Sequence, residues 1–160
     1  MLRIKIIAMG RLTEKPYMEM ASEFAKRISK TYRLEVAEPK PVRLPDDPSP
    51  AEISKALAKE AELIRAEIPA RSAVVAMCVE GKAMSSEQLS AYLSELSLSG
   101  TGQVCFIIGS SHGLDEDLKK EAGLRLSVSP MTFPHELFRV MLLEQIYRAG
   151  EIASGGKYHK

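Results

Sequence analysis

The first candidate for a reactive site is a loop of small and polar residues near the end of the chain. It follows a strand-like stretch in which Leu124, Leu126 and Val128 alternate with polar residues, and it ends where a helix should begin, just after Pro134. Proline fits the first turn of a helix, because its missing N–H would have no partner there. In open α/β sheets ligands bind at the carboxyl ends of strands, so we predict a binding site in this loop.

Signatures of several common sites are missing from the sequence. There is no G-x-G-x-x-G after the first strand-like stretch, which argues against a dinucleotide site, and there is no P-loop. Ser110 and Ser111 do not lie in G-x-S-x-G, and the three histidines are too scattered to indicate a metal site. A ligand without phosphates, held by backbone groups and apolar side chains, would leave this absence of signatures. S-adenosylmethionine is such a ligand.

The elements that would position this loop alternate between strand and helix, and we expect five of each. Apolar runs at 74–79 and 104–108 have the length of strands that are buried on both faces. The stretches 49–52 and 85–88 have the form of capping boxes that start helices. Residues 80–82 are interpreted as a turn. The alternation predicts an α/β domain with a mostly parallel sheet and helices on both faces.

Length and composition describe an ordinary globular protein, and we interpret residues 1–160 as a single domain. No apolar run approaches the ~20 residues needed to cross a bilayer, and the amino terminus lacks the plan of a signal peptide. We therefore expect a cytoplasmic protein without a membrane partner. The net charge of +1 excludes binding of nucleic acid by bulk charge alone. Residues 1–33 hold eight Lys and Arg against three Glu, which is compatible with a basic face or with an ordinary solvated surface.

Several sequence elements together resemble one known family. Phe106-Ile107-Ile108-Gly109 leads into a small-residue turn that ends at Gly113-Leu114. Thr132-Phe133-Pro134-His135 precedes the last helix, and the chain ends in Tyr158-His159-Lys160. With the opening Ile6-Ile7-Ala8-Met9-Gly10 and the agreement in chain length, these elements resemble the RlmH family of SPOUT-class methyltransferases. The resemblance extends from the first strand to the last residue.

The resemblance implies a fold and a reaction that local patterns cannot show. The fold would be a SPOUT-type α/β knot, in which the C-terminal region forms a trefoil knot by threading through an earlier loop. The enzyme would be a homodimer without a metal. It would transfer a methyl group from S-adenosylmethionine to N3 of a pseudouridine in 23S ribosomal RNA, on the assembled ribosome.

The resemblance also implies which residues contact the cofactor. Met77 and Gly109 match cofactor-binding positions of the family, and the segment 128–133 matches its knot loop, which comprises Val128, Ser129, Pro130, Met131, Thr132 and Phe133. One position departs from the family, which usually carries a second glycine where this chain has Ser110. We expect serine to restrict the backbone there more than glycine would.

The carboxyl-terminal residues are the candidates for catalysis. Methyl transfer mainly requires alignment of donor and acceptor, but N3 of the base carries a proton that must leave. By the resemblance we expect Tyr158 and His159 to fold over the knot from the partner subunit. Histidine titrates near neutral pH, so His159 is the candidate base. The alternative is that these residues form a disordered tail.

Basic residues of the last helix and the tail are candidates for RNA contacts, and they are Arg139, Arg148 and Lys160. Arg148 lies four residues after Glu144, so the two could instead form a surface ion pair. Two rival functions also stay open at this point. One is a nucleotide-binding α/β protein without methyl transfer, and the other is a ribosome-associated binding module without catalysis.

Overall fold

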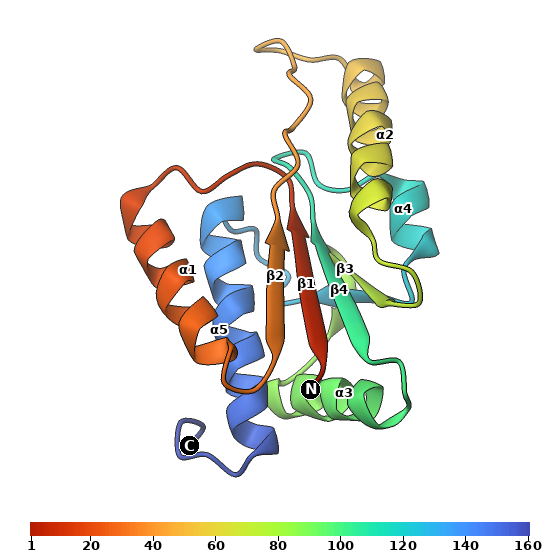
Figure 1. Cartoon of the computed structure of the whole chain (residues 1–160). Helices are drawn as coiled ribbons and strands as arrows, with labels where there is room; N and C mark the ends of the chain where they lie inside the picture. The colour runs from red at the N-terminus through yellow and green to blue at the C-terminus, as the bar shows by residue number, and fades with distance from the viewer.

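The computed structural model describes all 160 residues, and strands alternate with helices along the whole chain (Figure 1). The expected five strands and five helices are confirmed. In chain order they are β1 (Arg3–Ala8), α1 (Lys15–Ile28), β2 (Arg33–Ala37), α2 (Pro50–Glu67), β3 (Ala73–Ala83), α3 (Ser86–Leu98), β4 (Gln103–Ile108), α4 (Glu116–Glu121), β5 (Leu124–Ser127) and α5 (His135–Ala153). None of the helices combines the length and the apolar character that spanning a membrane requires.

The five strands form one sheet in the order β2-β1-β4-β3-β5, and every pairing in it is parallel. Parallel neighbours must be joined by crossover connections, which here contain the helices. All strands end at the same edge, so the segments that follow β3, β4 and β5 lie near one another. The predicted α/β fold with a mostly parallel sheet is confirmed.

Both faces of the sheet are covered, and each has its own apolar core. Helices α1, α3 and α5 cover one face, and α2 and α4 cover the other (Figure 1). Successive residues of a strand point to opposite faces, so Ile6 packs in the first core and Ile7 in the second. In β4, Phe106 packs in the first core and Ile107 in the second. This two-sided burial explains why the central strands are apolar at consecutive positions.

The two predicted capping boxes start α2 and α3. The Ser49 hydroxyl accepts a hydrogen bond from the Glu52 N–H at 3.2 Å, and the Glu52 carboxylate accepts one from the Ser49 N–H at 2.8 Å. Ser85 and Gln88 form the same reciprocal pair, at 3.2 Å and 2.8 Å. Each box satisfies backbone donors that the start of a helix leaves unpaired, which fixes where these helices begin.

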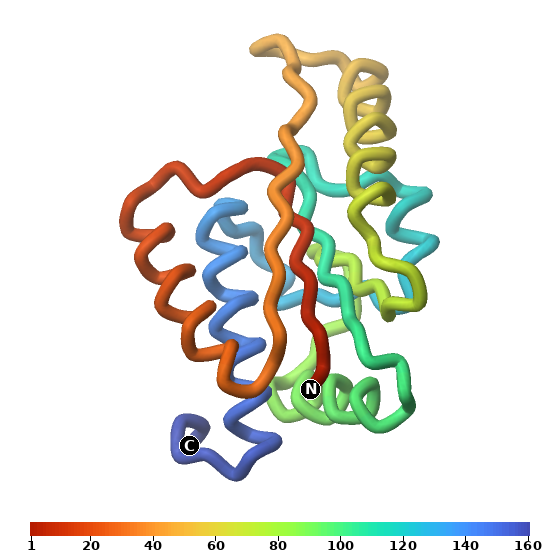
Figure 2. Tube along the Cα trace, viewed as in Figure 1, coloured from red at the N-terminus to blue at the C-terminus, as the bar shows by residue number.

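Strands β3 and β5 approach each other closely where they pair, and Figure 2 traces the backbone through this region. The prediction of a turn at residues 80–82 is wrong, because β3 continues through them. Leu126 faces both Met77 and Lys82, so the residues between these two bend around β5. A Cβ at Gly81 would lie 2.7 Å from the Leu126 carbonyl carbon, so only glycine allows this approach. The threading of a trefoil knot stays a prediction.

Candidate cofactor cavity and the carboxyl-terminal tail

A cavity of about 810 Å³ lies at the carboxyl edge of the sheet, where the sequence predicts a binding site. Its walls come from the middle of β3, the end of β4, the segment after β5, and parts of α2, α4 and α5. Ligand-binding pockets typically measure ~300–1,000 Å³ and combine apolar side chains with a few polar groups. This cavity has both, with Ile53, Leu57 and Phe138 beside the hydroxyl and backbone groups of two loops.

One wall of the cavity is the tight turn from Gly109 to Gly113, which follows β4. The Gly113 N–H donates to the Ser110 carbonyl oxygen at 2.9 Å and closes the turn. A Cβ at Gly109 would collide with the Gly113 carbonyl oxygen. The turn therefore requires glycine at position 109, and it brings backbone groups, rather than a side chain, to the cavity surface at that point.

Another wall is the segment from Val128 to Phe133, which joins β5 to α5. Two serines shape it. The Ser127 hydroxyl donates to the Ser129 carbonyl oxygen at 3.0 Å, and the Ser129 hydroxyl accepts from the Met131 N–H at 3.1 Å. Met131 is 72% exposed, so a large apolar side chain of this wall has little cover from the protein itself.

The positions predicted for cofactor binding converge on this one cavity, with a single exception. Pro130 does not line it. The positions that do are Met77, Gly109, Val128, Ser129, Met131, Thr132 and Phe133. They come from three separate parts of the chain, which the parallel sheet brings to one edge. Their contacts with a cofactor remain a proposal.

Sequence patterns missed two parts of the cavity wall. Ile53 and Leu57 share a helical stripe with core residues of α2, so their spacing gave no sign that they face a cavity. Lys119 of α4 also lines the cavity and is 8% exposed. Burial disfavours its charged form, but hydrogen bonds to Glu116 and Glu80 outweigh burial and raise the pKa of Lys119. A cluster of one lysine and two carboxylates therefore borders the cavity.

Arg139 is buried, which contradicts its expected role as an RNA contact. Its side chain is 3% exposed, and its guanidinium donates to the Glu38 carboxylate and to the Gly10 carbonyl oxygen. One turn earlier, the Glu136 carboxylate accepts from the Thr13 hydroxyl at 2.6 Å, and this bond is the main reason that the pKa of Glu136 is lowered. Together the two side chains fix the start of α5 to the segments that follow β1 and β2.

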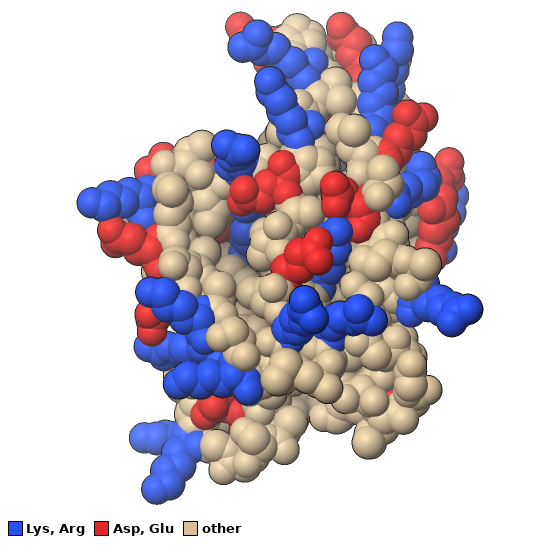
Figure 3. Space-filling view, viewed as in Figure 1, with Lys and Arg blue, Asp and Glu red and all other residues tan.

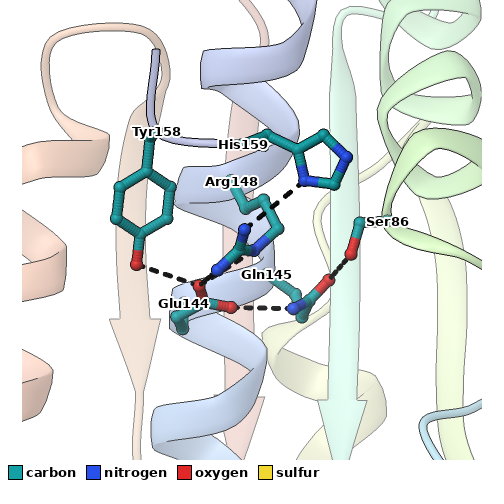
Figure 4. A network of polar contacts seen from close by, with 6 residues as sticks. All are labelled: Ser86, Glu144, Gln145, Arg148, Tyr158 and His159. Atoms are coloured by element: carbon teal, nitrogen blue, oxygen red, sulfur yellow. Dashed lines mark hydrogen bonds and ion pairs between the residues drawn. The ribbon is translucent and has the colours of Figure 1, made fainter. Parts of the chain in front are cut away.

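The carboxyl-terminal tail folds back onto the second half of α5 (Figure 4). The Tyr158 hydroxyl donates to the Glu144 carboxylate at 3.0 Å, and the Arg148 Nε donates to the same carboxylate at 3.0 Å. The His159 ring lies 3.4 Å from Arg148 and 2.8 Å from the Glu87 carboxylate of α3. Burial and the Glu144 carboxylate raise the pKa of Tyr158. The tail is therefore packed through specific side-chain contacts.

Tyr158 and His159 do not line the cavity of their own protomer. The cavity touches the start of α5 at His135 and Phe138, whereas the tail packs six residues after Phe138, at Glu144. At ~1.5 Å per residue, those six residues span roughly 9 Å along the helix axis. The predicted catalytic tail and the predicted cofactor loops are thus two separate places on one chain.

The other two candidates for RNA contact lie in different surroundings. Arg148 forms the i,i+4 ion pair with Glu144 and lies over the Tyr158 ring, 4.7 Å from its centre. Lys160 is exposed at the end of the chain. Figure 3 shows Lys and Arg side chains gathered over the carboxyl-terminal part of α1 and toward the chain end, with acidic side chains nearer the middle of that face. Lys26 and Arg27 of the last turn of α1 belong to this basic region.

A second cavity, of about 480 Å³, is an apolar groove between α1, α3 and α5. Its apolar side chains include Met20, Phe24, Met84, Leu137 and Met141. Val128 lines this groove as well as the larger cavity, so the two lie side by side. A molecule that covers the groove would therefore also approach the segment that is predicted to hold the cofactor.

Comparisons with known proteins agree on one family. The family model described as predicted SPOUT methyltransferase matches residues 2–159. The chain is 42% identical over 159 residues to ribosomal RNA large subunit methyltransferase H of Carboxydothermus hydrogenoformans, and 41% identical over 160 residues to the protein of that name from Clostridioides difficile. Each match covers 99% of this chain and 100% of the relative. A solved structure from Bordetella pertussis superposes with a TM-score of 0.52 at 16% identity, over 92% of this chain and 95% of the other, and supports the fold alone.

Proposed function

The chain belongs to the SPOUT methyltransferase family, and we propose that it transfers a methyl group from S-adenosylmethionine to N3 of a pseudouridine in 23S ribosomal RNA. Full-length relatives named as methyltransferases of the large-subunit RNA support the class of substrate. The pseudouridine and its N3 atom rest on the resemblance of the sequence motifs. The observation that carries the proposal is the cavity between the 109–113 turn and the segment 128–133, at the carboxyl edge of the sheet.

The lining of the cavity fits S-adenosylmethionine. The turn at Gly109 has no room for a side chain, so its backbone groups can approach a nucleoside directly. Met77 and Phe133 offer apolar surface, and the absence of a phosphate-binding loop agrees with a ligand that lacks phosphates. When bound, the cofactor supplies a methyl group that its sulfonium has already activated. Pro130, which lies outside the lining, would act by restricting the backbone of the segment 128–133.

The chain itself has to align two reactants and remove one proton. The raised pKa of Tyr158 keeps its hydroxyl protonated at neutral pH, so it can donate a hydrogen bond but is poorly suited to accept the proton of N3. We therefore assign the role of base to His159 and a role in positioning the target base to Tyr158. Both residues already make hydrogen bonds that orient their side chains.

A homodimer would unite the tail with the cavity. Within one protomer the two are separate, and the apolar groove beside Val128 offers a surface that a second copy could cover. In a dimer with two-fold symmetry, each tail would then complete the site of its partner. This arrangement accounts for a packed tail that carries candidate catalytic groups yet does not line its own cavity.

The proposed RNA substrate sets two further requirements. A base can reach a cavity of this kind only if it leaves its stack, which costs least in a loop of the RNA. A chain of this size also needs contacts beyond the base, and we propose that Arg148, Lys160 and the basic end of α1 supply some of them. The assembled ribosome in the cytoplasm would supply the rest of the docking surface.

A labelling experiment tests the proposal. The protein is incubated with ribosomes and with S-adenosylmethionine that carries a labelled methyl group, and the label is counted in RNA freed of protein. We expect label in 23S RNA, at a pseudouridine, and little label with the His159→Ala variant. Absence of label from RNA would support a binding module without catalysis.

A second measurement separates methyl transfer from general nucleotide binding. The melting temperature of the protein is compared without ligand and with S-adenosylmethionine, ATP or NAD. We expect only S-adenosylmethionine to raise it, because the cavity lacks the phosphate-binding elements that ATP and NAD require. A larger rise with ATP or NAD would contradict the proposal.

A further inference from the structure

Glu60 is a buried carboxylate that the proposed reaction does not use. It lies on α2 and is 4% exposed, whereas the other charged residues of this helix are exposed. Its oxygens accept hydrogen bonds from two neutral donors, the Val42 N–H at 3.0 Å and the Ser110 hydroxyl at 2.8 Å. A carboxylate that loses its hydration depends on the few donors that replace water, so each of these two bonds matters.

Through these bonds Glu60 joins three segments that are far apart in the sequence. Val42 belongs to the proline-rich connection between β2 and α2, and Ser110 belongs to the turn after β4. The connection is also tied to the end of β1, because the Gly10 N–H donates to the Pro39 carbonyl oxygen at 2.8 Å. Both α2 and the 109–113 turn line the larger cavity. The bond between Glu60 and Ser110 therefore sets how two walls of that cavity lie against each other.

The serine at position 110 fits its place in the turn. Arg71 is the one non-glycine residue with a positive φ, so Ser110 adopts an ordinary backbone conformation. Serine therefore fits this position of the turn without backbone strain. A glycine there would leave the turn without a hydroxyl for Glu60.

We propose that Glu60 is a positioning residue for the cofactor cavity. Its carboxylate holds the Ser110 hydroxyl, and with it the 109–113 turn, in the geometry in which the backbone at Gly109 can bind S-adenosylmethionine. The inference rests on the proposed function, since it takes the cavity to be the cofactor site. Glu60 itself does not line the cavity, and it acts on the turn through Ser110, which does.

The affinity of the full-length protein for S-adenosylmethionine, measured by titration calorimetry, tests this role. Ser110→Ala should weaken binding about tenfold, because it leaves a buried carboxylate oxygen without its donor. Glu60→Gln should bind within about threefold of the unaltered protein, because an amide can still accept from Val42 and donate to the Ser110 oxygen. The double variant Glu60→Ala/Ser110→Ala should bind no more weakly than Glu60→Ala, since the two side chains act as one pair.

Steady-state kinetics and a matched control distinguish positioning from general stability. For Ser110→Ala the KM for S-adenosylmethionine should rise about tenfold, with kcat at saturating cofactor within about twofold. Glu62→Ala removes an exposed carboxylate from the same helix and should change neither constant. If Glu60→Ala fails to fold, Ser110→Ala and Glu60→Gln still decide the question.

Two outcomes would overturn the inference in distinguishable ways. If Ser110→Ala binds S-adenosylmethionine as tightly as Glu62→Ala does, and only its melting temperature falls, Glu60 has a purely structural role. If the unaltered protein does not bind S-adenosylmethionine, the proposed function fails and the inference fails with it.

Discussion

The two halves of the proposed site, the cavity and the carboxyl-terminal tail, are formed by different kinds of chemical group. At the start of α5, the cavity is formed by backbone turns, glycine and apolar side chains. Further along the same helix, the tail is held by charged and polar side chains, with Tyr158 on Glu144 and His159 on Glu87. Backbone geometry is dictated by the sheet that carries it, whereas partly exposed polar contacts are individually weak. Under the proposed function, cofactor binding would thus depend on backbone geometry and the reactive groups on individual side-chain contacts.

The largest effect should come from adding one methyl group to the cavity end. Gly109→Ala places a Cβ against the Gly113 carbonyl oxygen, so the turn must open, and affinity for S-adenosylmethionine should fall at least about 100-fold in calorimetry. Gly123→Ala is the control, because its Cβ would meet the Val74 oxygen at an ordinary 3.7 Å. Near-normal binding by Gly109→Ala would show that cofactor binding does not depend on the backbone geometry of this turn.

At the tail end, loss of a side chain should affect chemistry and leave binding alone. His159→Ala should lower the rate of RNA methylation by about 100-fold or more, as expected for loss of a general base, with an unchanged Kd for S-adenosylmethionine. Lys157→Ala, two residues earlier and exposed, serves as the control. A variant that loses cofactor affinity in parallel with turnover would show that the two halves are not separate.

A smaller effect is expected at the last residue. Lys160→Ala should weaken binding to ribosomes a few-fold and reduce the slope of log K against log salt concentration by about one, as for loss of one phosphate contact. Lys120→Ala removes an exposed charge from α4 and should leave the slope unchanged. An unchanged slope for Lys160→Ala would remove this residue from the RNA-binding surface.

The smallest effect should be one of stability at the anchored start of α5. The pKa of Glu136 is lowered from 4.5, so its contribution to folding is present above that value and is lost as pH falls through the lowered value. Glu136→Gln should lower the melting temperature at pH 7 by roughly 2–4 °C, and the difference should shrink as the pH falls below 4.5. Thermal melts across pH, with Glu62→Gln as control, would measure it. A difference that stays constant down to acidic pH would assign the loss to packing.

Local patterns were sufficient where the physical cause is itself local. The reciprocal bonds of Ser49 and Ser85 with residues three positions ahead depend on neighbours in the sequence, and both helices begin where predicted. The prediction of a turn at residues 80–82 was wrong because the physical cause there is not local. Glycine can signal a turn or a close approach, and Gly81 serves the second purpose because of its contact with Leu126 in a distant strand.

In the candidate site, too, some features could be predicted from the sequence and others could not. The rule that ligands bind at the carboxyl ends of parallel strands located the cavity, and motif resemblance selected its residues. The burial of Arg139 could not be predicted, because its partners, Glu38 and Gly10, lie 101 and 129 residues away in the sequence. Glu60 was overlooked because a single acidic residue on a helix with many charges has no pattern that predicts burial.

The bend of β3 around β5 also has a consequence for the order in which the protein folds. The segment that forms one cavity wall follows β5, so it can take its place only after β5 has paired with β3. Pairings such as Arg3 with Gln103 are equally non-local, and folds of this kind assemble slowly. A chain in which β5 has not yet paired with β3 would therefore lack this wall of the cavity.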